Sequence, residues 1–134
     1  MTTLKNERVE IRFSDDVVRV RQVARTLALE AGLSLVDQTK IITAASELAR
    51  NTLDYGGGGF AVAELVEAAG RRGLKLTFED KGPGIADIDT ALKDGFTTGK
   101  GMGLGLGGAK RLSNEFSIHS KLGEGTKIVI ARWK

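Results

Sequence analysis

The chain has 134 residues, and its 20 Lys and Arg against 17 Asp and Glu give a net charge of +3, too weak and too mixed to indicate a nucleic-acid or anionic-membrane partner. It contains no cysteine and one histidine, which excludes a disulfide framework, a thiolate metal site and a histidine cluster. Because no run approaches the ~18 apolar residues of a membrane span and the N-terminus lacks an apolar signal segment, we expect a single cytoplasmic domain over residues 1–134.

The N-terminal part begins with an alternating segment and continues with two helical patterns. Residues 7–13 alternate between apolar and polar side chains, which predicts a strand. Its apolar face is expected to consist of Val9, Ile11 and Phe13. A helix is predicted from the caps at residues 14–16 to about Gly32, and a second helix from the cap at Ser34 to about Leu53. The apolar stripe of the second helix comprises Ile41, Ile42, Ala45, Leu48 and Ala49.

The remaining sequence combines strand patterns with glycine-rich segments. Residues 60–69 and 74–80 predict two strands joined by a turn. Residues 82–103 form a long irregular connection with a short helix near residues 89–93, and a connection this long in a small domain is usually functional. The last predicted elements are a helix at 104–114 and strands at 116–120 and 126–133. The resulting order, β-α-α-β-β-α-β-β, predicts an α/β sandwich whose strands pair largely as hairpins.

The strand at residues 74–80 ends in a carboxylate. Its apolar positions are Leu74, Leu76 and Phe78. Because side chains alternate faces along a strand, Asp80 continues the buried face, where a carboxylate is costly unless it is hydrogen-bonded. Gly82 opens the backbone just beyond it, so a ligand amine, such as the exocyclic amino group of adenine, would satisfy the carboxylate. The alternative is an aspartate that only begins a turn.

A second polar pair lies on the helix predicted to end near Leu53. Glu47 and Asn51 stand four residues apart, so they project from one helix face, outside the apolar stripe. Asn51 is a poor helix former, and an Mg²⁺ ion would explain its position, because Mg²⁺ takes few protein oxygens and completes its shell with phosphates and water. Glu47 would orient or deprotonate a hydroxyl or a water molecule. The alternative is a solvated pair on the surface.

The third element is a run of alternating glycines at residues 98–106. Such a run is not stable as a strand or as a helix interior. It suits a loop that wraps phosphates and leads into a helix N-terminus, where free N–H groups favour anions, and Lys100 would add a positive charge. The alternative is a mobile linker.

Two other motif matches at these glycines do not hold. Gly103, Gly105 and Gly108 fit G-x-G-x-x-G, but no hydrophobic strand precedes them, so a dinucleotide fingerprint is rejected. Gly99 and Lys100 suggest a P-loop, but no Ser or Thr follows the lysine.

The three elements, in this order, resemble the three sequence boxes of the GHKL superfamily of gyrase B, Hsp90, histidine kinases and MutL. The matching segments are residues 47–51, 80–85 and 99–105. The resemblance covers nearly the whole chain. It implies a two-layer Bergerat ATP-binding sandwich, with a mixed, mostly antiparallel sheet, helices on one face and a flexible ATP lid.

Within that superfamily the chain is similar to the small serine kinases of partner-switching systems, and especially to the stressosome switch kinases. The segments that carry this likeness are residues 36–38, 46–51, 94–96, 110–112 and 123–127. The resemblance implies a protein serine/threonine kinase that uses ATP and Mg²⁺ and phosphorylates a STAS-domain antagonist or scaffold. Once released, it would bind a downstream effector such as a PP2C-type phosphatase.

Two alternative functions remain open within the superfamily. One is an anti-sigma factor, which would bind a sigma subunit of RNA polymerase and phosphorylate its anti-anti-sigma factor. The other is an ATPase fragment of a histidine kinase, which requires a phospho-accepting histidine on a dimerisation helix. His119 lies instead in a strand pattern.

The resemblance also implies roles for individual residues. Glu47 would be the general base on the target hydroxyl, Asn51 would hold Mg²⁺, and Asp80 would bind the adenine amino group. Gly84 would shape the adenine pocket, and Thr126 would support the aspartate from a neighbouring strand. The lid would comprise residues 95–105. The residues implied to bind the nucleotide are Asn51, Asp80, Gly82, Gly84, Ile85, Thr98, Gly99, Lys100, Gly101, Met102, Gly103, Leu104, Gly105 and Thr126.

Overall fold

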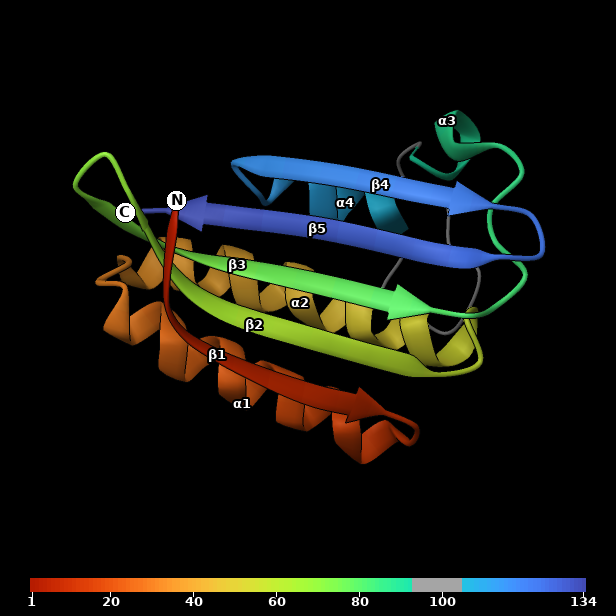
Figure 1. Ribbon diagram of the computed structural model, residues 1–134, viewed down its shortest axis with the longest axis horizontal. Coiled ribbons are helices and arrows are strands. Elements are labelled where there is room, and N and C mark those ends of the chain that lie inside the picture. Colours follow the sequence, from red (N-terminus) through yellow and green to blue (C-terminus); the bar gives the residue numbers. More distant parts are fainter. Residues whose placement is uncertain (93–104) are drawn as a thin grey trace.

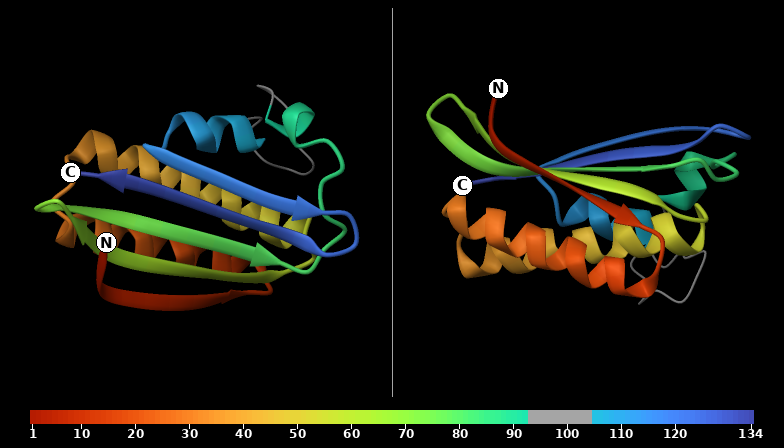
Figure 2. Two further views of the ribbon diagram at one scale, coloured as in Figure 1. Left: turned by 45° about the horizontal axis from the view of Figure 1, so that its top comes forward. Right: turned by 60° about the horizontal axis from the view of Figure 1, so that its bottom comes forward.

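The computed structural model describes residues 1–92 and 105–134, and it contains one five-stranded sheet with strand order β1-β2-β3-β5-β4. Every pairing between these strands is antiparallel. The helices lie on one face of the sheet, which makes two layers (Figure 1, Figure 2). The elements are β1 (Thr2–Ile11), α1 (Ser14–Glu30), α2 (Leu35–Asp54), β2 (Gly59–Ala68), β3 (Arg71–Asp80), α3 (Ile88–Ala91), α4 (Gly105–Arg111), β4 (Glu115–Lys121) and β5 (Gly125–Trp133). The predicted element order and two-layer sandwich are confirmed, with α3 as the expected short helix, whereas the sheet is entirely antiparallel where a mixed one was expected.

The first strand differs from its prediction at both ends. It begins at Thr2 and stops at Ile11, so the prediction that Phe13 shares its buried face is wrong: Phe13 is 71% exposed and precedes α1. The cause is local, because the Asp16 carboxylate accepts hydrogen bonds from the backbone N–H groups of Arg12 (2.8 Å) and Phe13 (3.0 Å). These two bonds lower the pKa of Asp16 and turn the chain from the sheet into the helix.

One hydrophobic core fills the space between the sheet and the helices. Leu74, Leu76 and Phe78 of β3 are at most 1% exposed, so the face predicted from their alternation is the inner one. The first helix buries Val17, Val20, Ala24, Leu27 and Ala28, and the second buries Ile41, Ala44, Ala45, Leu48 and Ala49. The predicted cap of α2 is also present, since Ser34 Oγ accepts a hydrogen bond from the Asp37 N–H at 3.1 Å.

Arg132 of β5 joins the two layers. Its Nη2 lies 2.9 Å from Oδ1 of Asp37 in the first turn of α2, and its Nη1 donates to the carbonyl of Leu112, just after α4, at 3.1 Å. The arginine side chain is only 13% exposed, so solvent and salt screen this contact weakly. The arrangement holds α2 and α4 against β5, and both helices contribute to the cavity described below.

Two further predictions concern the lid and membrane spans. The residues 93–104, which include most of the predicted ATP lid, lie outside the described part of the chain. Within residues 1–92 and 105–134, no helix has the length and hydropathy needed to cross a bilayer.

Candidate active site

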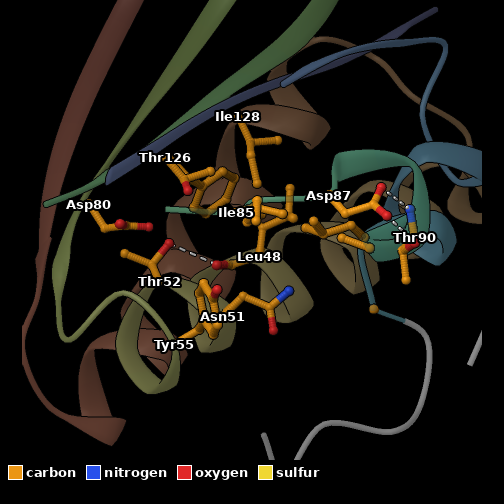
Figure 3. A pocket seen from close by; sticks show the side chains of 15 residues that line it. Leu48, Asn51, Thr52, Tyr55, Asp80, Ile85, Asp87, Thr90, Thr126 and Ile128 are labelled. Carbon is orange, nitrogen blue, oxygen red and sulfur yellow. Dashed lines mark hydrogen bonds between the residues drawn. The ribbon is translucent and has the colours of Figure 1, made fainter. Parts of the chain in front are cut away.

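A cavity of about 200 Å³ lies between α2 and the adjoining ends of β3 and β5, next to α3 and the first turn of α4. Figure 3 shows Asp80 and Thr126 toward one end, Asp87 and Thr90 toward the other, and Asn51 along the wall between them. The polar lining consists of Asn51, Thr52, Tyr55, Asp80, Asp87, Thr90 and Thr126. Apolar lining residues include Leu48, Phe78, Ile85, Ala91, Leu106 and Ile128. A mostly apolar cavity with a few convergent polar groups is the usual form of a small-molecule site.

Asp80 is the last residue of β3 and lies half-buried at one end of this cavity. Burial raises the pKa of Asp80, while the backbone N–H groups of Gly82 and Thr126 act in the opposite direction. The bond from Gly82 N to Asp80 Oδ1 is 2.9 Å. The expectation that this carboxylate continues the inner face of the strand is confirmed, because it lines the cavity with inward-facing residues of β3 and β5.

Asn51 and Glu47 share one side of α2 but occupy different surroundings. Asn51 is half-buried and lines the cavity. Glu47 is 7% exposed, so the alternative of a solvated surface residue is wrong for it. Its Oε1 accepts a hydrogen bond from the backbone N–H of Gly105, the first residue of α4, at 3.3 Å. The glutamate therefore lies behind the cavity wall and connects α2 to Gly105, which is both the last residue of the predicted lid and the first residue of α4.

Thr126 faces Asp80 across the β3–β5 pairing, as the predicted supporting role requires. Its Oγ1 lies 2.8 Å from Ser120 Oγ of β4, which also accepts a hydrogen bond from Ile85 N at 2.8 Å. Ser120 thus attaches the loop after β3 to the last hairpin. Sequence reasoning missed this serine, because one hydroxyl in an alternating polar strand carries no distinguishing signal.

The turn after β3 requires a glycine at position 84. Gly84 has φ +76°, and a Cβ at this position would lie 2.1 Å from the carbonyl oxygen of Lys121. The Tyr55 hydroxyl donates to the Gly84 carbonyl at 2.8 Å, which ties the end of α2 to this turn. Tyr55 stands four residues after Asn51, which places both on the same side of the helix.

A matched pair of alanine variants tests this requirement. Gly84→Ala is expected to lower the free energy of unfolding by about 3 kcal/mol or more, because the left-handed backbone is strained and the Cβ overlaps a backbone oxygen. Gly123→Ala has nearly the same φ, +79°, with no atom within 4 Å of its Cβ, so it should cost only about 1–2 kcal/mol. Urea unfolding followed by the fluorescence of the single tryptophan measures both. Equal losses would show that backbone conformation alone matters.

A second glycine requirement lies directly beside Asp80. A Cβ on Gly56 would approach the carboxyl carbon of Asp80 to 2.4 Å. Gly56 therefore leaves room for the aspartate side chain. Of the predicted nucleotide-binding residues, the structure brings Asn51, Asp80, Ile85, Gly105 and Thr126 to the cavity, with Gly82 and Gly84 in the adjoining turn; Thr98, Gly99, Lys100, Gly101, Met102, Gly103 and Leu104 lie outside the described residues.

Comparison with known families agrees with this geometry. The sequence profile of the histidine kinase-, DNA gyrase B-, and HSP90-like ATPases matches residues 36–134. The chain belongs to this ATPase family. The matched span begins in α2 and includes Asn51 and Asp80, two polar residues that line the cavity.

A relative within the family defines the type of enzyme. The serine/threonine-protein kinase RsbT of Bacillus subtilis (strain 168) is 49% identical over 125 residues, which cover 93% of this chain and 94% of that protein. An identity of this size over nearly the full length of both proteins places the chain among the serine/threonine-protein kinases of the ATPase family. The enzyme therefore uses ATP.

Solved structures of distant relatives show the same fold. The RsbU and RsbW domains of Rv1364c from Mycobacterium tuberculosis superpose with a TM-score of 0.67 at 19% identity, over 97% of this chain and 33% of that one. The SiaB-SiaC complex from Pseudomonas aeruginosa gives a TM-score of 0.53 at 12% identity, over 98% of this chain and 91% of that one. At these identities the likeness concerns the fold alone.

Proposed function

We propose that this kinase transfers the γ-phosphate of ATP to a serine or threonine of a small STAS-domain protein in a partner-switching system. The observation that carries the proposal is the cavity, which brings Asp80 and Asn51 together from separate elements with Glu47 buried behind them. The identity of 49% to a serine/threonine-protein kinase supports the same reaction type.

Asp80 fits the amino group of adenine. A carboxylate has about four acceptor positions, and the N–H groups of Gly82 and Thr126 leave part of that capacity free toward the cavity. The purine would lie against the apolar side chains of Ile85 and Ile128. Because burial disfavours the ionised carboxylate, a donor from the ligand stabilises it, which makes this end of the cavity selective for an amine.

Asn51 fits a role toward the phosphates and a magnesium ion. Its amide oxygen is an oxygen ligand of the kind that Mg²⁺ uses together with phosphates and water. When bound, Mg²⁺ neutralises charge on the transferring phosphoryl group. Glu47, one helical turn earlier, would accept the proton of the target hydroxyl as general base. Its present partner, the Gly105 N–H, belongs to the last residue of the predicted lid, so we infer that the position of Gly105 and the exposure of the Glu47 carboxylate are linked.

The partners follow from the same proposal. Released from its STAS-domain substrate or scaffold, the kinase would bind a downstream effector such as a PP2C-type phosphatase. An anti-sigma function would use the same nucleotide cavity, so the nature of the bound protein separates the two, and the identity to RsbT favours the switch kinase.

Phosphoryl transfer to defined acceptors tests the proposal. We expect the kinase, with labelled ATP and Mg²⁺, to phosphorylate a STAS domain encoded beside it, and we expect no label on the same domain with its mapped serine or threonine changed to alanine. A sigma subunit offered at the same concentration should not be retained by the kinase. Retention of the sigma subunit, or absence of label on every STAS domain offered, would contradict the assignment.

A further inference from the structure

A second hollow lies between α1 and α2 on the side away from the nucleotide cavity. This α1–α2 groove has a volume of about 650 Å³ and shares no lining residue with the nucleotide cavity. The first helix contributes Val18, Arg21, Gln22 and Arg25, and the second contributes Ile42 and three hydroxyl side chains. Figure 2 shows the two helices side by side beneath the sheet. The groove is therefore formed by two long helices and not by a loop.

The two hollows use opposite faces of α2. Ile42 and Ser46 line the groove, whereas Asn51 and Tyr55 line the nucleotide cavity. At 3.6 residues per turn these two pairs point about 180° apart around the helix axis. A molecule seated in the groove therefore leaves the nucleotide cavity open.

The charge of the groove is positive and uncompensated. Arg21 and Arg25 are exposed, stand one helical turn apart, and form no ion pair with any residue of the described ranges. The described residues that line the groove include no aspartate or glutamate. Two free guanidinium groups on one helix face attract carboxylates and suit them geometrically, because each can bind a carboxylate through two N–H donors.

Two exposed apolar side chains lie before and after these arginines on the same side of α1. Val18 is 40% exposed and Leu29, farther along the same side of α1, is 59% exposed. Eleven residues at 1.5 Å each separate them, about 16 Å or three helical turns. Leu35, at the start of α2, is 78% exposed beside the second end. This spacing matches the apolar face of a short amphipathic helix laid along the groove.

The floor of the groove contains an unsatisfied polar atom. Ser46 Oγ is buried and has no hydrogen-bond partner among the described residues. Buried hydroxyl groups in folded proteins are nearly always hydrogen-bonded, so this atom is an exception among the described residues.

We propose that the α1–α2 groove binds an acidic amphipathic helix of a partner protein. Its apolar side chains would pack against Val18 and Leu29, and its carboxylates would bind Arg21 and Arg25. The surface is independent of phosphoryl transfer, since it lies on the opposite face of α2. The kinase can thus hold a protein partner and a nucleotide at the same time, and loss of one function does not imply loss of the other.

A designed peptide pair tests the groove directly. The probe is a fluorescein-labelled peptide of about 18 residues with leucines at helical spacing and glutamates elsewhere, and its control has lysine in place of every glutamate. By fluorescence anisotropy the acidic peptide should bind at least about tenfold more tightly than the basic one. Arg21→Glu combined with Arg25→Glu should lower the affinity for the acidic peptide by at least about tenfold. Lys75→Glu combined with Lys127→Glu makes the same charge change on the sheet, and it should alter the affinity for the acidic peptide by less than about twofold.

Several outcomes would overturn the proposal. Equal losses in the two double variants would show a response to net charge alone, and absence of peptide binding would remove the groove as a helix site. ATP affinity, measured for each variant, should stay within about twofold of the parent, which reports an intact fold. If sedimentation shows that the parent is a dimer and the Arg21 and Arg25 variant a monomer, a second copy of this chain occupies the groove instead.

Discussion

Replacing Glu47 by glutamine is expected to lower the rate of phosphoryl transfer by about 10²–10⁴-fold, the usual contribution of a general base. ATP affinity should change by less than about twofold, because the glutamine carbonyl can still accept the hydrogen bond that Gly105 N donates at 3.3 Å. Single-turnover transfer to the STAS-domain substrate and equilibrium binding of ATP measure the two quantities separately.

Glu47→Ala separates loss of the proton acceptor from loss of the hydrogen bond to Gly105. Alanine removes the proton acceptor and also the partner of the first residue of α4, where Gly105 and Leu106 line the cavity. We therefore expect Glu47→Ala to lose transfer and also to weaken ATP binding by about three- to tenfold. If the glutamine variant retains transfer at the parent rate, Glu47 is not the base and its role is to hold α4.

Asp80→Asn is expected to weaken ATP binding by about 10–100-fold, the loss of a hydrogen bond to a charged group in a partly buried site. An amide has one oxygen where the carboxylate has two. The Gly82 N–H donates to Oδ1 of Asp80, so in the variant the amide oxygen takes that place, and the NH₂ is turned toward the ligand and meets the adenine amino group donor to donor. Isothermal titration with ATP measures the loss.

Inosine triphosphate makes this test specific to the adenine contact. Its ring bears a carbonyl in place of the amino group, so the parent kinase should prefer ATP, and Asp80→Asn should reduce or reverse that preference. Asp54→Asn is the matched control, because Asp54 is exposed at the end of α2 and does not line the cavity. Equal weakening of both nucleotides by Asp80→Asn would point to a structural role and rule out the contact.

Although Asp80→Asn should weaken ATP binding, it is expected to raise the thermal stability of the nucleotide-free kinase. The pKa of Asp80 is raised above its ordinary value of 3.8 in the folded chain, chiefly by burial. A carboxyl group whose pKa is raised by folding contributes stability at pH values below its unfolded pKa, and this contribution is lost as the pH rises through the folded pKa. At pH 7, Asp80→Asn should therefore raise the melting temperature by on the order of 2 °C, and this gain should shrink toward pH 4. A lower melting temperature at pH 7 would contradict this account.

Several parts of the site could be predicted because they depend on residues close together in the chain. Alternation through Leu74, Leu76 and Phe78 was enough to place Asp80 on the inner face of its strand. The pairing of Glu47 and Asn51 on one side of α2 follows from helical spacing in the same way. The prediction for Phe13 was wrong because a local cap, the Asp16 carboxylate, overrides the alternation of the preceding strand.

Other parts of the site depend on segments that are distant in the sequence. Glu47 meets Gly105 across 58 residues, and Tyr55 meets Gly84 across 29. The space that Gly56 leaves for Asp80 likewise appears only when the end of α2 lies beside the end of β3. No local pattern encodes such contacts, because they depend on which faces pack together.

By itself, the sequence determined the order of the elements, the inner face of β3 and the three boxes that resemble those of this ATPase superfamily. Local periodicity and turn chemistry carry that information, since they act within a few residues. Only the tertiary structure decided that Glu47 is buried against α4, that Ser120 holds the loop at Ile85, and that Arg21 and Arg25 flank a groove. Those features arise from packing of the helices on the sheet and on each other, where burial and hydrogen-bond satisfaction act between distant segments.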